Sequence, residues 1–245
     1  MAASHGLNGR IYAAGYDLSQ YFTELKLKRS YSSGEHSGLG QAGKLYLPGR
    51  ETVALSGSGR FVGSASAVDV RMNTALTQSG TAIYSIIVDT DAAGGIGYGF
   101  VGDNNQYDVS SPDDGIVSIA MAAQGSGSKG ERSIVLFPLA ARGTAASTAH
   151  NNAASSANGG SAYLQVTANT VTSLNVLIEG SATAAWAGEE VTLATFTQVL
   201  LATGVTSQRI AWTGTTQQYV RAAATVVAGG GAVTFAVMFH RAQYA

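Results

Sequence analysis

Alternation of apolar and polar residues in short segments, repeated along nearly the whole chain, is the feature that most constrains this fold. In ELKLK at 24–28, leucine alternates with charged residues, which is typical of a strand with one solvated face. Similar segments, separated by Gly, Asn and Ser, occur at 44–47, 52–62, 82–89, 115–123, 132–140, 161–168, 173–180, 191–199, 208–214, 219–227 and 232–241. Strands of this length and spacing predict an all-β sandwich or barrel.

One segment departs from this alternation. In SAVDVRMNTALTQSG the apolar residues recur at helical spacing, Ser66 and Asp69 form a capping box, and Gly80 can end a helix. The sequence therefore predicts a single short helix at about 66–79, with its apolar side packed on the sheets.

Two long, weakly hydrophobic segments interrupt the strands, at 30–43 and at 142–160. Each lies between two strand segments, which suggests an internal duplication into two β units. The second segment, rich in Ser, Ala and Asn, also fits a linker. The expected organisation is an N-terminal β domain at 1–141, a linker or second long loop at 142–160, and a C-terminal β-sandwich half at 161–245. Two domains and two repeats both stay open.

Charged residues are scarce. Only 12% of the chain is Asp, Glu, Lys or Arg and the net charge is −1, whereas an average domain is about 25% charged. The chain thus lacks the basic excess that drives binding to nucleic acid or anionic membranes. A small, neutral surface carries little repulsion between copies, so this composition favours self-assembly.

Several classes of site have no basis in the composition. Cysteine is absent, which excludes disulfides and thiolate chemistry. The N-terminal MAASHGLNGR lacks the features of a secretory signal. The longest apolar stretch, at 226–239, is interrupted by three glycines and is shorter than the roughly 20 residues of a membrane span. We expect no membrane span.

The segment GLGQAGKL at 38–45 matches two phosphate-binding patterns, the dinucleotide fingerprint and the Walker A loop as far as Leu45. Both patterns require a helix after the glycines, whose N-terminal amides hold the phosphate. The following KLYLPG alternates as a strand does and ends at Pro48 and Gly49. We therefore interpret the glycines as the bend of a long hairpin and expect no nucleotide cofactor.

Catalytic and metal sites are likewise not expected. The histidines at positions 5, 36, 150 and 240 are scattered, and no nucleophile elbow is present. The acidic pairs at 113–114 and 189–190 lie in turn-like contexts. The sequence predicts a protein that is not an enzyme and has no metal or cofactor.

Residues 89–114 form a locally acidic segment without Lys or Arg. Solvated turns are the simplest interpretation. The alternative is a negative surface that repels phosphate, which is useful where nucleic acid must pass without binding. Its six aspartates are Asp89, Asp91, Asp103, Asp108, Asp113 and Asp114.

The segment from Gly15 to Phe61 resembles the N-terminal part of tail tube (major tail) proteins of long-tailed bacteriophages. The shared features are the DLS at 17–19, the long loop at 30–43, the strand at 44–49, SGSGRF at 56–61 and the helix expected at 66–79. The second half of the chain is similar to β-sandwich segments of phage tail structural proteins.

This resemblance implies a virion protein of the phage tail, made in the host bacterial cytoplasm, whose rings stack into a hollow tube that carries DNA. It implies rings of six subunits, or of three if each chain contributes two units, and contacts with the terminator, tape measure and distal tail proteins. The acidic segment would line the lumen. The stacking loop would comprise Ser32, Ser33, Gly34, Glu35, His36, Ser37, Gly38, Leu39, Gly40, Gln41, Ala42 and Gly43.

Two other classes of function stay open. One is a capsid decoration protein or a receptor- or glycan-binding β-sandwich, suggested by the second half of the chain and by Trp186 and Trp212, which we expect to be exposed. The other is an enzyme, for which GLGQAGKL is the sole motif.

Overall fold

The computed structural model describes residues 9–37, 43–63, 68–77, 82–113, 115–186, 188–227 and 231–242. These residues form antiparallel sheets and one short helix, so the predicted all-β class is confirmed. The chain divides into two compact units that do not follow chain order. Unit 1 comprises Met1–Ser19, Ile83–Gly99 and Glu131–Ala245, and unit 2 comprises Gln20–Ala82 and Phe100–Gly130.

Unit 2 is built on four antiparallel strands in the order β3-β4-β7-β6. Three of these strands belong wholly to the unit: β3 (Phe22–Glu35), β4 (Tyr46–Arg60) and β7 (Ser118–Gly125). The fourth strand, β6 (Ile96–Ser110), belongs to unit 2 from Phe100 onward.

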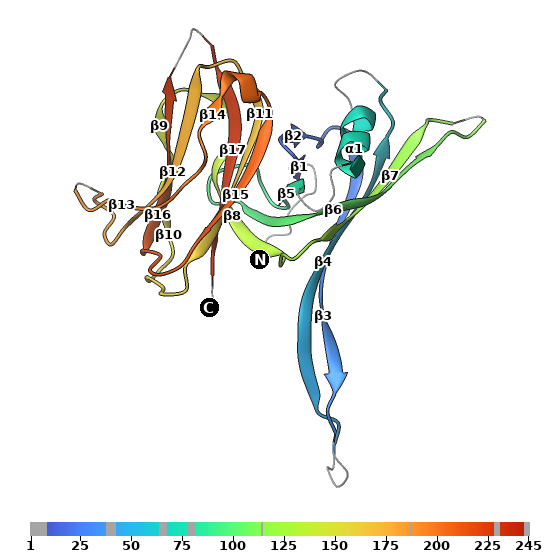
Figure 1. Cartoon of the computed structure of the whole chain (residues 1–245), viewed down its shortest axis with the longest axis horizontal. Helices are drawn as coiled ribbons and strands as arrows, with labels where there is room; N and C mark the ends of the chain where they lie inside the picture. The colour runs from blue at the N-terminus through green and yellow to red at the C-terminus, as the bar shows by residue number, and fades with distance from the viewer. Residues whose placement is uncertain are drawn as a thin grey trace. The chain divides into compact units, whose positions relative to one another are not determined.

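One face of the unit 2 sheet carries its core. Leu55, Ile119 and Met121 are buried there, and the helix α1 (Val68–Thr77) lies against this face with Val68 and Met72 buried (Figure 1). A helix was predicted at about 66–79 and is confirmed within the described residues. Burial of each large apolar side chain stabilises the fold by about 1.5–3 kcal/mol.

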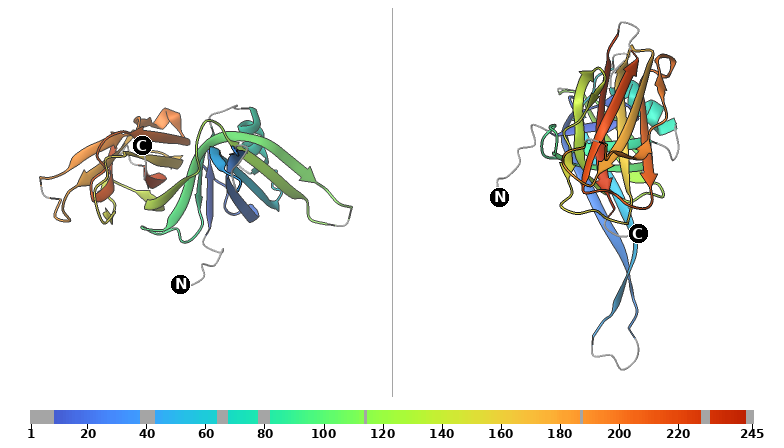
Figure 2. Two further views of the ribbon diagram at one scale, coloured as in Figure 1. Left: turned by 90° about the horizontal axis from the view of Figure 1, so that it is seen from below. Right: turned by 90° about the vertical axis from the view of Figure 1, so that its left-hand side faces the viewer.

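β3 and β4 continue well beyond the sheet as a two-stranded ribbon, which we call the arm and define as residues 29–37 and 43–53. Figure 1 shows it extending from the unit 2 sheet, and Figure 2 shows its strands twisting around each other. Pairing continues from Arg29↔Val53 to Glu35↔Tyr46. The prediction that 30–43 is a loop is therefore wrong for 30–35, which is strand.

The prediction that Pro48 and Gly49 end a strand is also wrong, because β4 runs through both residues. The register shifts here, so that Gly49 and Arg50 lie opposite Ser32 in a bulge. A proline is compatible with a strand that is not in the middle of a sheet.

Unit 1 contains a β-sandwich. Its first sheet has the order β15-β11-β17-β8, followed by the start of β6 and by β5, β1 and β2. These strands are β1 (Arg10–Ala13), β2 (Tyr16–Asp17), β5 (Ala82–Ile87), β8 (Glu131–Arg142), β11 (Gly160–Asn169), β15 (Thr206–Trp212) and β17 (Val233–Arg241).

The second sheet of unit 1 has β16 and β12 at its centre. Its elements are β9 (Ala145–Ala146), β10 (His150–Asn151), β12 (Ser173–Ser181), β13 (Val191–Thr195), β14 (Val199–Leu200) and β16 (Tyr219–Val227), with a 3-10 turn at Leu201–Thr203. Leu164, Phe235 and Phe239 of the first sheet and Val176 and Ile178 of the second are buried in one core between the sheets.

The expected linker at 142–160 lies within unit 1. Its strands β9 and β10 both pair with β16, and Ser156 forms a bridge with Thr216. The hypothesis that the chain arose by duplication stays a hypothesis.

The strand β6 was not predicted from the sequence. Its residues IGYGFVGDNNQYDVS lie in the acidic segment that we interpreted as solvated turns, and for 96–110 that interpretation is wrong. Glycine, Asp and Asn are depleted from strands, and here pairing with β8 at 96–99 and with β7 at 102–110 outweighs their low propensity.

Candidate assembly surfaces

Unit 2 has a second face, opposite α1, that is largely exposed. Side chains alternate between the faces of a strand, so paired residues on neighbouring strands share a face. Three rows of paired residues cross this surface, which we call the open face. The rows are Lys28, Ala54, Gln124 and Asp103; Lys26, Ser56, Ala122 and Gln106; and Glu24, Ser58, Ala120 and Asp108.

The two edges of this face differ in net charge. Lys26 and Lys28 project from β3, whereas Asp103 and Asp108 project from β6. The two strands between them contribute the small side chains of alanine and serine, together with Gln124. Glu24 also projects from β3, between the lysines and the start of that strand, so the β3 edge is net basic (two lysines against one glutamate), the two middle strands are neutral in these rows, and the β6 edge is acidic.

A bulge in β6 sets this arrangement. Asn104 pairs with Ala123 and Gln106 pairs with Ala122, which leaves Asn105 without a partner on β7. The side chain of Asn104 is buried. In the amide orientation that satisfies both its oxygen and its nitrogen, the nitrogen donates to the carbonyl oxygens of Ala122 (2.7 Å) and Gln106 (3.2 Å). The extra residue reverses the alternation, so Asp103 and Asp108 share the open face.

Both edges of the unit 2 sheet are open within the described part of the chain. β3 pairs there with β4 alone, and β6 from Gln106 to Ser110 pairs there with β7 alone. An open edge presents unpaired backbone N–H and C=O groups to any strand that can pair with it.

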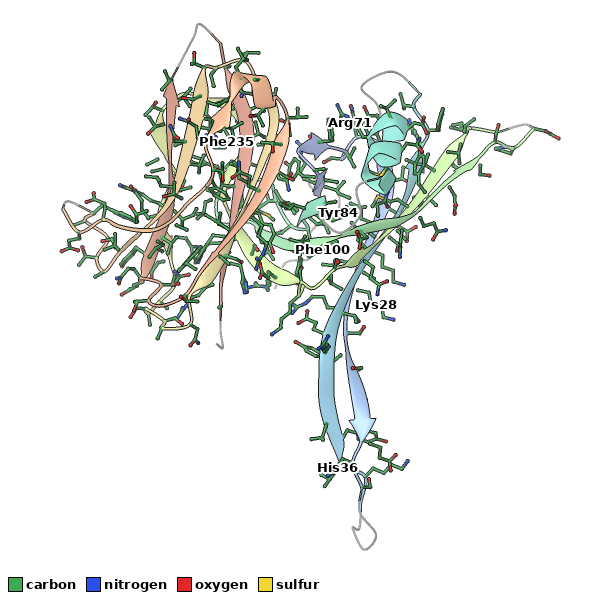
Figure 3. The ribbon with its side chains drawn as sticks, viewed as in Figure 1. Lys28, His36, Arg71, Tyr84, Phe100 and Phe235 are labelled. Atoms are coloured by element: carbon green, nitrogen blue, oxygen red, sulfur yellow. The ribbon has the colours of Figure 1, made fainter. Side chains whose placement is uncertain are left out.

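An ion pair stabilises the base of the arm. Arg29 Nε lies 2.6 Å from Glu51 Oε1, and the Tyr31 hydroxyl donates to Glu51 Oε2 (2.9 Å). The Glu51 side chain is only 2% exposed. Burial alone would raise its pKa, but the hydrogen bonds from Arg29 and Tyr31 outweigh burial and lower the pKa. Figure 3 shows Lys28 near this base and His36 far along the arm.

The arm exposes large apolar side chains near its base, at Tyr31, and farther along it, at 45–47. Tyr31, Leu45, Tyr46 and Leu47 are each more than half exposed, at 61%, 52%, 55% and 58%. The backbone there is closely packed, since a Cβ on Gly49 would lie 2.1 Å from the Ser32 hydroxyl oxygen and 2.9 Å from the Ser32 carbonyl oxygen. A two-stranded ribbon is at best marginally stable by itself in water. These features suit a segment that is covered in an assembly.

The predicted stacking loop lies on this arm. Ser32, Ser33, Gly34 and Glu35 belong to β3, and the backbone N–H of His36 donates to the Leu45 carbonyl oxygen (2.7 Å). The residues 38–42 lie outside the described residues, and their stacking role stays a prediction.

The structure does not bring the six predicted aspartates into one described cluster. Asp89 and Asp91 belong to unit 1, where Asp91 Oδ2 lies 3.4 Å from Arg10 Nε, and partial burial raises the pKa of Asp91. Asp103 and Asp108 share the open face, and Asp113 is exposed after β6. Residue 114 lies outside the described residues.

Unit 1 contains a half-buried polar cluster that was not predicted from the sequence. Glu131 accepts hydrogen bonds from Ser161 (2.5 Å), from Tyr163 and from Arg209, which contributes its Nη2 at 2.5 Å. Burial would raise the pKa of Glu131, but these three donors outweigh burial and lower it. The cluster joins β8 to β11 and β15 across the intervening strand β17, and we interpret it as structural.

The two tryptophans are not exposed as expected. Trp186 is 8% exposed and lies under the Arg221 guanidinium, 4.1 Å from the ring centroid. Trp212 is half-buried, stacks on Phe239 at 5.9 Å and donates to the Thr216 hydroxyl (3.1 Å). The sequence argument for a glycan-binding surface on these residues is therefore wrong, because both rings are used in packing.

The glycines of GLGQAGKL lie mostly outside the described residues. The segment that follows them is the strand β4, as predicted, and not a helix. Among the residues that the structure does describe, no group of three His, Asp or Glu is placed to hold a metal ion. No helix in the same part of the chain is long and apolar enough to cross a membrane.

No protein-family model matches the chain. No curated protein matches it either.

Solved structures that align with the chain at low identity include proteins of tails and tail-like particles. A protein in the virion of a native gene transfer agent is 14% identical, with a TM-score of 0.43, over 52% of this chain and 98% of that chain. The SPP1 tail tube protein is 11% identical, with a TM-score of 0.43, over 52% of this chain and 78% of that chain. The SPP1 Dit protein, described as a hub of the adsorption apparatus, is 13% identical, with a TM-score of 0.35, over 95% of this chain and 98% of that chain.

Proposed function

We propose that this chain is a structural virion protein whose copies join through the unit 2 sheet into rings, and that the rings stack into the hollow tube of a phage tail through which DNA passes. The observation that carries this proposal is the structure of the unit 2 sheet. The helix α1 covers one face of this sheet, and its two edge strands are open in the described residues.

The strand directions suit a ring. Each neighbouring pair in β3-β4-β7-β6 is antiparallel, so β3 and β6 at the two edges are also antiparallel to each other. Rotation about an axis along the strands preserves strand direction. The β3 of a second copy, placed beside β6, therefore continues the antiparallel ladder, and closure of such a series removes every open edge.

The same rotation keeps each face of the sheet on the same side of the ring. With α1 outside, the open face lines the bore. Small side chains such as Ala54, Ser56 and Ala122 make a smooth wall. Arg60, two residues beyond Ser58 on β4, projects from the same face next to the three rows. Lys26, Lys28 and Arg60 then balance Glu24, Asp103 and Asp108, which gives no net attraction for phosphate.

The arm supplies the contact between rings in this proposal. Its apolar side chains, Leu45, Tyr46 and Leu47 among them, are exposed in a single copy. Burial against the next ring would remove that area from water, which favours stacking.

Negative-stain electron microscopy of the purified full chain tests the proposal. We expect rings or hollow tubes, with a sedimentation coefficient that rises with protein concentration. Monomers at every concentration and salt level would overturn it.

A further inference from the structure

The open face has charges of opposite sign at its two edges, and this polarity bears on how copies pair. We propose that Lys26 and Lys28 of one copy pair with the acidic edge of the next copy, centred on Asp108, and that these ion pairs set the direction and stagger of the ring. The inference rests on the proposed function, since it concerns the contact between copies of unit 2.

The charges first select which edges meet. If β3 paired with the β3 of another copy about Leu27, Lys26 would face Lys28. If β6 paired with β6 about Asp108, that residue would face its own counterpart. Like charges directly opposite across strands are destabilising, whereas opposite charges are stabilising. The pattern therefore disfavours these two symmetric registers and favours pairing of β3 with β6, a head-to-tail contact that repeats into a ring.

The charges also select a stagger. With no stagger, the three rows of the open face would continue unchanged into the next copy. Lys28 would then lie beside Asp103, but Glu24 would lie beside Asp108 and repel it. A closed barrel requires some stagger between strands, so the unstaggered register is disfavoured on both grounds.

Sliding β3 of the second copy along β6 by one pair of residues removes the repulsion between Glu24 and Asp108. Lys26 of the second copy then lies beside Asp108, and Lys28 lies beside Gln106, which already donates to Asp108 (2.6 Å). Glu24 moves beside Ser110. Both lysines then approach the part of β6 that pairs with β7 alone within the described residues. The opposite shift would move them toward Asp103 and away from this open part.

Charge reversal tests the pairing. Asp108→Lys should leave the circular dichroism spectrum unchanged and reduce the assembled fraction at least tenfold, and Lys26→Asp with Lys28→Asp should do the same. Asp113→Lys is the matched control, because it makes the same change of charge in an exposed turn outside the face. It should assemble as the unchanged chain does.

Recombination of the changes distinguishes a lost ion pair from a damaged fold. A mixture of the Asp108→Lys and Lys26→Asp/Lys28→Asp chains should form rings of alternating copies, although neither assembles alone. The chain with all three changes should also recover. Both recoveries, and assembly of the unchanged chain, should weaken as salt is raised from 0.05 M to about 0.5 M, because salt screens exposed charges.

Assembly of Asp108→Lys at the unchanged level, or failure of both recoveries, would overturn the pairing and leave the proposed ring intact. Absence of rings from the unchanged chain would instead overturn the proposed function.

Discussion

Lys28 and Asp103 lie at opposite edges of the unit 2 sheet but belong to one row of paired residues, joined through Ala54 and Gln124. They are 75 positions apart in the chain. Asp108 shares this face with Asp103 because Asn105 is unpaired, since without that residue the two aspartates would project from opposite faces. The polarity of the open face is therefore a property of the bulge.

The bulge should be weakened by loss of the Asn104 side chain. Asn104→Ala removes two hydrogen bonds and leaves the carbonyl oxygens of Ala122 and Gln106 without that donor. We expect the opening free energy of β6 and β7 to fall by about 1–3 kcal/mol, measured by hydrogen exchange of their backbone amides. Asn105→Ala, at the exposed neighbouring position, should change it by less than about 0.5 kcal/mol. Equal effects of the two changes would contradict this role.

The close approach at Gly49 should make the arm sensitive to a side chain there. In Gly49→Val the new Cβ meets the Ser32 backbone as well as its hydroxyl, and overpacking of this kind costs about 1–3 kcal/mol. Limited proteolysis should then cut the arm on the order of tenfold faster. Gly34→Val is the control on the opposite strand, where a Cβ has no neighbour within 4 Å. Equal rates of proteolysis for the two variants would contradict this expectation and show that the bulge accommodates the new side chain at position 49.

The apolar side chains of the arm should matter to stacking and not to folding. Leu45→Ser with Leu47→Ser replaces two exposed side chains, so the stability of the single chain should change by less than about 0.5 kcal/mol per site. Rings should still form, but electron micrographs should show few tubes. Ile116→Ser, at a 74% exposed position outside the arm, should leave tube length unchanged. Tubes of normal length from the double variant would show that the two leucines are incidental.

Unit 1 should lose stability in acid through Glu131. The folded-state pKa of Glu131 lies below its ordinary value of 4.5, so its contribution is fully present above that value and is lost as the pH falls through the folded-state pKa. Urea unfolding between pH 3 and pH 7 measures this, and Glu131→Gln should flatten the pH dependence.

The same change should also lower stability at pH 7 by about 1–3 kcal/mol, because Arg209 loses its partner. Lys44→Gln breaks the exposed Lys44–Glu35 pair instead and should have an effect of less than about 1 kcal/mol. A pH profile of Glu131→Gln identical to that of the unchanged chain would show that another group titrates.

Local pattern determined most of the strands and the helix. The alternation at 161–168, 173–180 and 219–227 corresponds to β11, β12 and β16, and the helical spacing after residue 66 corresponds to α1. These elements are predictable because each presents one apolar side to a core, and that requirement is written in the spacing of neighbouring residues.

Tertiary contacts decided the features on which assembly depends. β6 is a strand in spite of its glycines and aspartates because β7 and β8 pair with it. Residues 30–35 extend as an arm because β4 pairs with them, and the tryptophans are covered by Arg221 and Phe239. The positions of the charges along the chain are fixed by the sequence, but their face and edge are fixed by strand register. Register depends on partners that are distant in the chain, and a single unpaired residue is enough to reverse it.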